Sequence, residues 1–249
     1  MIGSAVMVRV ESQTRSLDSR ATEEIVYPDT DGQPMGETEF HVVATLHLYD
    51  ALRHFFRNTP DVYVIADMFL YYEEGNPRAN KAPDVMVVKG VEKRKRRTFK
   101  TWEEHAAPCV IFEVTSKSTM VEDMISKSML YASLGVREYF LFDPLQEYLD
   151  NSLMGFRLEG NEYVAMQPDE DGLLFSQELG VALTVQEHLV RILDPHTHQP
   201  VPALDEAVAK AEQEAQRAEQ EAQRAEQERR RAEVAEVEIA RLRAMLKDA

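Results

Sequence analysis

The chain has 249 residues, a formal net charge of −16, 44% hydrophobic residues and one cysteine, which fits one sizeable globular domain plus an appendage. The acidic charge argues against a nucleic-acid coat protein, because phosphate binding needs a basic surface, and the single Cys109 excludes an intrachain disulfide and a multi-cysteine zinc site. No apolar run reaches the roughly 18–20 residues that span a bilayer, so we expect a cytoplasmic protein without a membrane partner.

The first part of the chain is expected to contain an irregular segment and one helix. Residues 1–24 are predicted to be irregular, and the main domain is expected to cover 25–200. A helix is predicted from about Glu37 to Arg57, followed by the helix-ending run Asn58-Thr59-Pro60. Its apolar residues recur at helical spacing: Val42, Leu46, Tyr49, Leu52 and Phe56.

Three β-like segments follow this helix. The first, residues 61–72, is rich in Val, Ile, Tyr and Phe. The other two, Asp84–Val88 and Cys109–Val114, are short and almost continuously apolar after their first residue. Such runs are typical of central strands that are covered on both faces of a sheet.

A second helix is predicted from about Val121 to Leu134. Thr119 and Glu122 have the spacing of a capping box at its start, and Gly135 is well placed to end it. A helical wheel places Met124 and Met129 on one apolar face and Lys127 largely opposite. We therefore expect Lys127 to reach a site only if both sides of the helix are covered, or if its long stem extends from an overhanging end.

The rest of the domain is predicted to be β-rich. Residues 138–142 (Glu-Tyr-Phe-Leu-Phe) indicate a strand that ends at Asp143-Pro144. Residues 150–195 indicate further short strands, with turns at Gly160-Asn161 and Asp171-Gly172. The order up to residue 142 is therefore helix, three strands, helix, strand.

The C-terminal region, residues 203–249, has a different character. The heptad Ala-Glu-Gln-Glu-Ala-Gln-Arg occupies residues 211–217 and recurs at 218–224. Small or apolar residues alternate at spacings of four and three, which predicts a coiled-coil helix and at least a homodimer. The seam is mostly alanine and Arg229 interrupts its phase. A solvated single helix held by Glu–Arg pairs is therefore the alternative.

Acidic residues at strand ends form the candidate site. Asp84 opens one apolar strand, Glu113 lies near the end of another, and Asp123 precedes Lys127 by four residues on the second helix. Two buried carboxylates on neighbouring strands repel each other unless a cation compensates them. Magnesium prefers a few carboxylates plus oxygens of water and phosphate, and it can activate a water nucleophile. The alternative is structural, with Asp84 capping a turn and Glu113 paired with Lys127.

A run of cations lies between two of the predicted strands. It consists of Lys93, Arg94, Lys95, Arg96 and Arg97, and we call it the basic strip. A nucleic-acid backbone would be held by such a strip. A solvated loop is the competing interpretation.

The stretch from Tyr71 to Pro144 resembles the Uma-two family of endonucleases, within the restriction-endonuclease-like PD-(D/E)XK superfamily, and the resemblance extends over roughly residues 25–195. The residues that carry it are Ala82-Pro83-Asp84-Val85, the run Glu113-Val114-Thr115-Ser116-Lys117-Ser118-Thr119, Asp123, Lys127, Tyr131, Gly135-Val136-Arg137-Glu138-Tyr139 and Phe142-Asp143-Pro144. The resemblance implies a restriction endonuclease-like core, an α/β (α+β) fold with a mixed central sheet flanked by helices. It also implies metal-dependent hydrolysis of DNA.

The resemblance also implies roles for single residues. Asp84 and Glu113 would be ligands of magnesium, which manganese could replace, and the backbone carbonyl of Val114 would add a third oxygen. The parent motif has a lysine two residues after the glutamate, where this chain has Thr115. Lys127 is therefore expected to supply the missing amine.

Further residues are expected to support Asp84, Glu113 and Lys127. Lys117 is the nearby competitor of Lys127, and Asp123 is a further candidate for the site. From the first helix, Glu39 or Glu37 is expected to add an acid, with His41 close to both.

Two functional hypotheses follow. The first is a metal-dependent nuclease with Asp84, Glu113 and Lys127 at its centre and DNA as substrate. The second is a catalytically silent nuclease-fold protein that acts through its coiled coil as an assembly or binding module.

Overall fold

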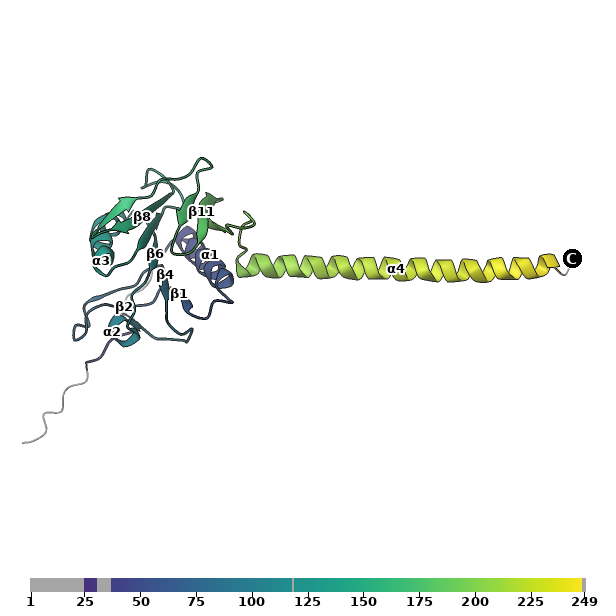
Figure 1. Ribbon diagram of the computed structural model, residues 1–249, viewed down its shortest axis with the longest axis horizontal. Helices are drawn as coiled ribbons and strands as arrows, with labels where there is room; N and C mark the ends of the chain where they lie inside the picture. Colours follow the sequence, from purple (N-terminus) through teal and green to yellow (C-terminus); the bar gives the residue numbers. More distant parts are fainter. Residues whose placement is uncertain (1–24, 31–36, 118, 248–249) are drawn as a thin grey trace, which may run out of the picture.

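A six-stranded mixed sheet lies at the centre of the structure, which is a computed structural model describing residues 25–30, 37–117 and 119–247 (Figure 1). The segment predicted to be irregular, residues 1–24, lies outside the described residues. The strand order is β1-β4-β6-β7-β8-β9, with β6 and β7 parallel and all other neighbours antiparallel. The strands are β1 Val62–Ala66, β4 Val85–Lys89, β6 Val110–Val114, β7 Glu138–Phe142, β8 Leu153–Glu159 and β9 Glu162–Ala165. The predicted mixed α/β fold is confirmed.

Three of the four inner strands, β4, β6 and β7, are buried on both faces. Every residue of β6 and β7 is buried, as are all residues of β4 except Lys89. Alternate residues of these strands belong to two separate hydrophobic cores, one on each face of the sheet. The short apolar runs of the sequence are therefore central strands, as predicted.

Helix α1, Glu39–Phe55, covers one face of the sheet. Thr38 caps it by accepting a hydrogen bond from the backbone amide of His41. A three-stranded sheet of β10 Leu174–Ser176, β11 Val181–Gln186 and β12 Leu189–Leu193 completes this layer. The inner side of α1 packs on β1 and β12, and the core here includes Leu48 and Leu52. The predicted helix is confirmed, with ends two residues inside the expected ones.

The opposite face is covered by a helix of mixed type. Its first part, η1 Glu122–Lys127, is a π-helix, and its second part, α3 Ser128–Ser133, is an α-helix. The predicted helix is therefore confirmed, and its first half has π geometry. The expected capping box is wrong, because no side chain caps η1. The Thr119 hydroxyl instead accepts from the backbone amide of Ser116. Gly135 ends the helix with φ +76°, as predicted.

The segment predicted as one β-like run over residues 61–72 is broken in two. After β1, Asp67 has φ +45°, and its amide donates to the carbonyl oxygens of Pro83 and Asp84. This turn anchors the chain at the start of β4. Beyond it, a small sheet is formed by β2 Leu70–Tyr71, β3 Asn80–Lys81 and β5 Phe99–Lys100, followed by the short helix α2 Thr101–Glu104.

Helix α4, Leu204–Lys247, extends away from the rest of the chain (Figure 1). It is attached at its first turn, where Arg191 of β12 forms a 2.6 Å ion pair with Glu206. Residues 208–236 are exposed along its whole circumference. The predicted long helix is confirmed, and its pairing into a coiled coil stays a prediction. Among the described residues, no helix is long and apolar enough to cross a membrane.

Candidate active site

Strands β4 and β6 bring the two predicted acids together. In their antiparallel register Val85 lies opposite Phe112, so the residue before Val85 lies beside the residue after Phe112. Asp84 and Glu113 therefore meet at one end of the sheet. The Asp84 carboxylate accepts a 2.7 Å hydrogen bond from the backbone amide of Val114, which fixes it against the end of β6.

Glu113 is a buried carboxylate held on both oxygens. Its side chain points to the face covered by η1 and α3, and the residue is 1% exposed. The Tyr131 hydroxyl donates to Oε1 at 2.7 Å, and the Lys127 ammonium lies 2.9 Å from Oε2. Burial raises the pKa of Glu113, and the negative charges of Asp84 and Asp123 raise it further, against the opposing effect of Lys127. The site thus holds more negative charge than one ammonium balances.

Lys127 bridges two carboxylates. Besides Glu113, its ammonium lies 2.8 Å from Oδ1 of Asp123, and Oδ2 of Asp123 accepts from the Thr115 hydroxyl at 3.0 Å. Burial alone would lower the pKa of Lys127, but Glu113 and Asp123 outweigh burial and raise it. Lys127 is therefore an ammonium ion. Thr115 therefore holds Asp123, the acid that contacts Lys127.

The helix formed by η1 and α3 turns its charged side toward the site, not its apolar side. Asp123 and Tyr131 are buried, and Lys127 lies between them on the same inward face. The apolar Met124 and Met129 are exposed by 44% and 70%. The apolar face of the helical wheel is therefore the outward one, and Lys127 reaches Glu113 from the inward one. In an α-helix, residues four apart are displaced in one direction around the axis. The wider π turn displaces them in the opposite direction, so Asp123, Lys127 and Tyr131 stay close to one line.

The N-terminal half of α1 contributes a histidine. His41 Nε2 lies 3.0 Å from Oδ1 of Asp84, and its Nδ1 lies 3.5 Å from a carboxylate oxygen of Glu37. Burial would lower the pKa of His41, but its contact with Asp84 and the charge of Glu37 give a net rise. Of the two expected upstream acids, Glu37 therefore contacts His41, which in turn contacts Asp84. Glu39 is exposed, and no described contact joins it to the site.

The other predicted residues lie elsewhere. Lys117 is exposed, and no described contact joins it to Glu113. The basic strip follows β4, so it starts at the end of that strand opposite Asp84. Arg94 and Arg96 both pair with Glu104, at 2.6 and 2.7 Å. A role of the strip in nucleic-acid binding stays a prediction.

The donor set suits a hard divalent cation. Asp84 and Glu113 offer carboxylate oxygens, and the excess negative charge around buried Glu113 is what a bound cation would relieve. In an antiparallel pair, both backbone groups of a residue face the same neighbouring strand. The carbonyl of Val114 therefore faces the side on which its amide meets Asp84. Within the described residues no three His, Cys, Asp or Glu side chains form a metal cluster. Magnesium tolerates this, because it keeps several waters and substrate oxygens.

Comparison with known proteins agrees with this fold. Residues 15–196 match the family model described as "Uma2: Putative restriction endonuclease". A solved structure described as a putative nuclease belonging to DUF820 from Anabaena variabilis ATCC 29413 is also similar. It shares 13% sequence identity at a TM-score of 0.47, over 62% of this chain and 82% of that chain. No curated protein matches the sequence.

Proposed function

Because the chain belongs to the Uma2 (Uma-two) family of restriction endonucleases, we propose that it is an endonuclease that hydrolyses DNA phosphodiester bonds with magnesium or manganese. Asp84 and Glu113 would hold the ion, together with the carbonyl of Val114. The observation that carries the proposal is the position of the Lys127 ammonium, 2.9 Å from the carboxylate of Glu113. This arrangement places the Lys127 ammonium and two carboxylates at one end of the sheet, although the lysine of the parent motif is missing.

The residues divide the chemical work according to their charge states. A bound magnesium ion would lower the pKa of a coordinated water and stabilise charge on the phosphate. Lys127 has a raised pKa and carries its proton, so it donates hydrogen bonds to developing negative charge and does not act as a base. Tyr131 orients Glu113 through its 2.7 Å hydrogen bond. His41 and the amide of Val114 hold Asp84 in place from two sides.

A cleavage assay on supercoiled, linear and single-stranded DNA tests the proposal. We expect the wild type to nick or cut DNA with magnesium or manganese and to stop on addition of a chelator. Asp84→Asn should lower the rate by at least about a hundredfold, because it removes a ligand charge while keeping the side-chain shape. Asp171→Asn, an exposed turn position, is the matched control and should cleave like the wild type.

The same assay has a pH arm. Burial raises the pKa of Glu113, and an ion binds the carboxylate and not the acid, so binding must release a proton. The metal concentration for half-maximal cleavage should therefore fall as the pH rises. A chelator-resistant activity, or full activity in Asp84→Asn, would sink the metal-dependent mechanism.

A second candidate function, assembly, is favoured by α4. Its alanine seam is exposed along residues 208–236, and we propose that two copies of the chain pair through it. Glutamates flank the seam on both sides, at positions 212, 219 and 226 on one side and 214, 221 and 228 on the other. In a symmetrical pair these glutamates repel each other. The dimer should therefore be weak at low salt and stronger at high salt.

Light scattering on the full chain tests this pairing. Ala215→Glu together with Ala222→Glu puts charge into the seam and should give a monomer. Gln213→Glu together with Gln220→Glu adds the same charge on the opposite side of the helix and should keep the dimer. A monomeric wild type at high salt would contradict self-association and leave the helix available to a different protein.

A further inference from the structure

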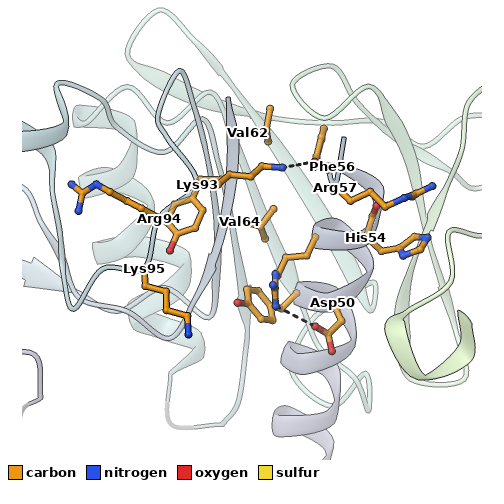
Figure 2. Close-up of a pocket in the computed structure, with 12 residues that line it drawn as sticks. Asp50, His54, Phe56, Arg57, Val62, Val64, Lys93, Arg94 and Lys95 are labelled. Carbon is orange, nitrogen blue, oxygen red and sulfur yellow. Dashed lines mark hydrogen bonds and ion pairs between the residues drawn. The ribbon is translucent and has the colours of Figure 1, made fainter. Parts of the chain in front are cut away.

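A groove of about 600 Å³ lies between the C-terminal half of α1, strand β1 and the loop after β4. Figure 2 shows its form: Lys93, Arg94 and Lys95 line one side, His54 and Arg57 the other, and Val62 and Val64 of β1 lie between them. Since β1 and β4 are antiparallel, with Val62 opposite Lys89, the groove lies at the end of the sheet away from Asp84. It is a second site, separate from the acidic one.

The groove is strongly basic on an acidic chain. Its lining contains Arg53, Arg57, Lys93, Arg94 and Lys95 with His54 and one acid, Asp50, although the whole chain carries −16. Arg94 also pairs with Glu104, so Arg57, Lys93 and Lys95 are the cations without a carboxylate partner among the described contacts. The walls come from segments 36 residues or more apart, so the charge gathers only in the folded chain. A concave surface lined by one sign of charge raises the local concentration of ligands of the other sign.

Several contacts give the groove a fixed shape. The Lys93 ammonium donates to the backbone carbonyl of Phe56 at 2.5 Å, which ties the basic strip to the end of α1. The Arg57 guanidinium donates to the carbonyl of His54 at 2.9 Å. Within the strip, the Arg96 side chain is 2% exposed and lies over the ring of Tyr63 at 4.8 Å. Carbonyl contacts order Lys93 and Arg57 without neutralising them, so both charges remain available to an anion.

The groove and the acidic site lie at opposite ends of α1. His41, near the start of the helix, contacts Asp84, and Arg57 follows its last turn. At about 1.5 Å per residue, the 16 residues between them span roughly 24 Å. A DNA duplex rises about 3.4 Å per base pair, so this distance is about seven base pairs.

We propose that this groove binds the phosphate backbone of DNA about seven base pairs from the bond that is cut. The inference rests on the proposed nuclease function and adds Arg53, His54 and Arg57 to the predicted strip. Cations lie on both walls of the groove, where they can contact the phosphates of a DNA backbone that runs along it. An acidic peptide added to the edge strand β1 is the competing occupant, and the experiment below distinguishes it.

The test measures DNA binding by fluorescence anisotropy on the full chain, in calcium and with Asp84→Asn as background, so that no cleavage is needed. Arg57→Ala with Lys95→Ala removes two exposed cations from the groove. For a 20-base-pair duplex, we expect a 10- to 100-fold loss of affinity near ~0.1 M salt. The slope of log affinity against log salt should fall by about two. Arg217→Ala with Arg224→Ala, on exposed faces of α4, is the matched control and should change neither value.

Duplex length gives a second arm. A six-base-pair duplex cannot contact the acidic site and the groove at once, so the groove variant should lose less affinity for it than for the 20-base-pair duplex. An unchanged salt slope on the long duplex, or an equal loss on both duplexes, would overturn the proposal. So would a variant that loses polyglutamate binding and keeps DNA binding, which would assign the groove to an acidic peptide. Failure of cleavage by the wild type would affect the proposed function alone, because binding is measured without it.

Discussion

Replacing Lys127 with methionine should lower the rate of DNA cleavage by about a thousandfold, the loss seen when a buried donor to developing negative charge is removed. Methionine keeps an apolar stem of similar length but cannot donate to the phosphate. Lys117→Met is the matched control, because Lys117 is exposed and makes no described contact with Glu113. Its rate should stay within about threefold of the wild type. Single-turnover cleavage at saturating metal is the measurement, because it reports the chemical step.

A folding defect must be separated from a chemical one in this experiment. Lys127→Met leaves Glu113 and Asp123 without the ammonium that lies within 2.9 Å of both, and buried unpaired charge destabilises a protein. The melting temperature and the DNA affinity of each variant should therefore be measured beside its rate. A folded, DNA-binding Lys127→Met that still cleaves, beside an inactive Lys117→Met, would move the catalytic amine to Lys117.

Replacing Glu138 with alanine should lower the free energy of unfolding by about 3–5 kcal/mol without touching the chemistry. Glu138 is fully buried on β7 and accepts from the Ser176 hydroxyl, the Gln177 amide and the Arg157 guanidinium. The alanine variant removes the acceptor of the Ser176 hydroxyl and the Gln177 amide, and it removes the carboxylate that pairs with Arg157. The melting temperature should fall by roughly 10 °C, at 2–4 °C per kcal/mol for a domain of this size.

The control for this prediction is Glu159→Ala, an exposed acid at the end of the neighbouring strand β8. It should melt within about 1 °C of the wild type, because exposed substitutions change stability little. Below its melting temperature, Glu138→Ala should cleave at the wild-type rate. A variant that melts normally and loses cleavage would make Glu138 a catalytic acid, and the tie between β7 and β10 would need another explanation.

The sequence predicted the parts of the site that depend on local pattern. Short apolar runs predict central strands. Asp84 begins one such run and Glu113 interrupts another, at positions where burying a charge is costly. A carboxylate within an apolar strand can be recognised as a candidate site residue from the sequence alone. The register of β4 and β6 then places the two acids side by side.

The missed features depend on partners far along the chain or on backbone type. A helical wheel takes the more apolar side as the inward one, but here Met124 and Met129 are exposed and Lys127 faces Glu113. The π geometry of residues 122–127 leaves no mark in the apolar periodicity either. The partner of Glu138, Ser176, lies 38 residues downstream. The groove likewise joins α1 to a strip more than 30 residues away. Single-sequence periodicity carries no information about such pairings.

The connection between β6 and β7 has a consequence for the order of folding. These strands are the parallel pair of the central sheet, and the chain between them, residues 115–137, contains η1 and α3 with Lys127. The chain between β4 and β6, residues 90–109, is almost as long, so the two closures cost similar loop entropy and neither is required to come first. Where β4 and β6 pair first, Asp84 and Glu113 meet before Lys127 is in place, and a bound divalent cation would stabilise that pair.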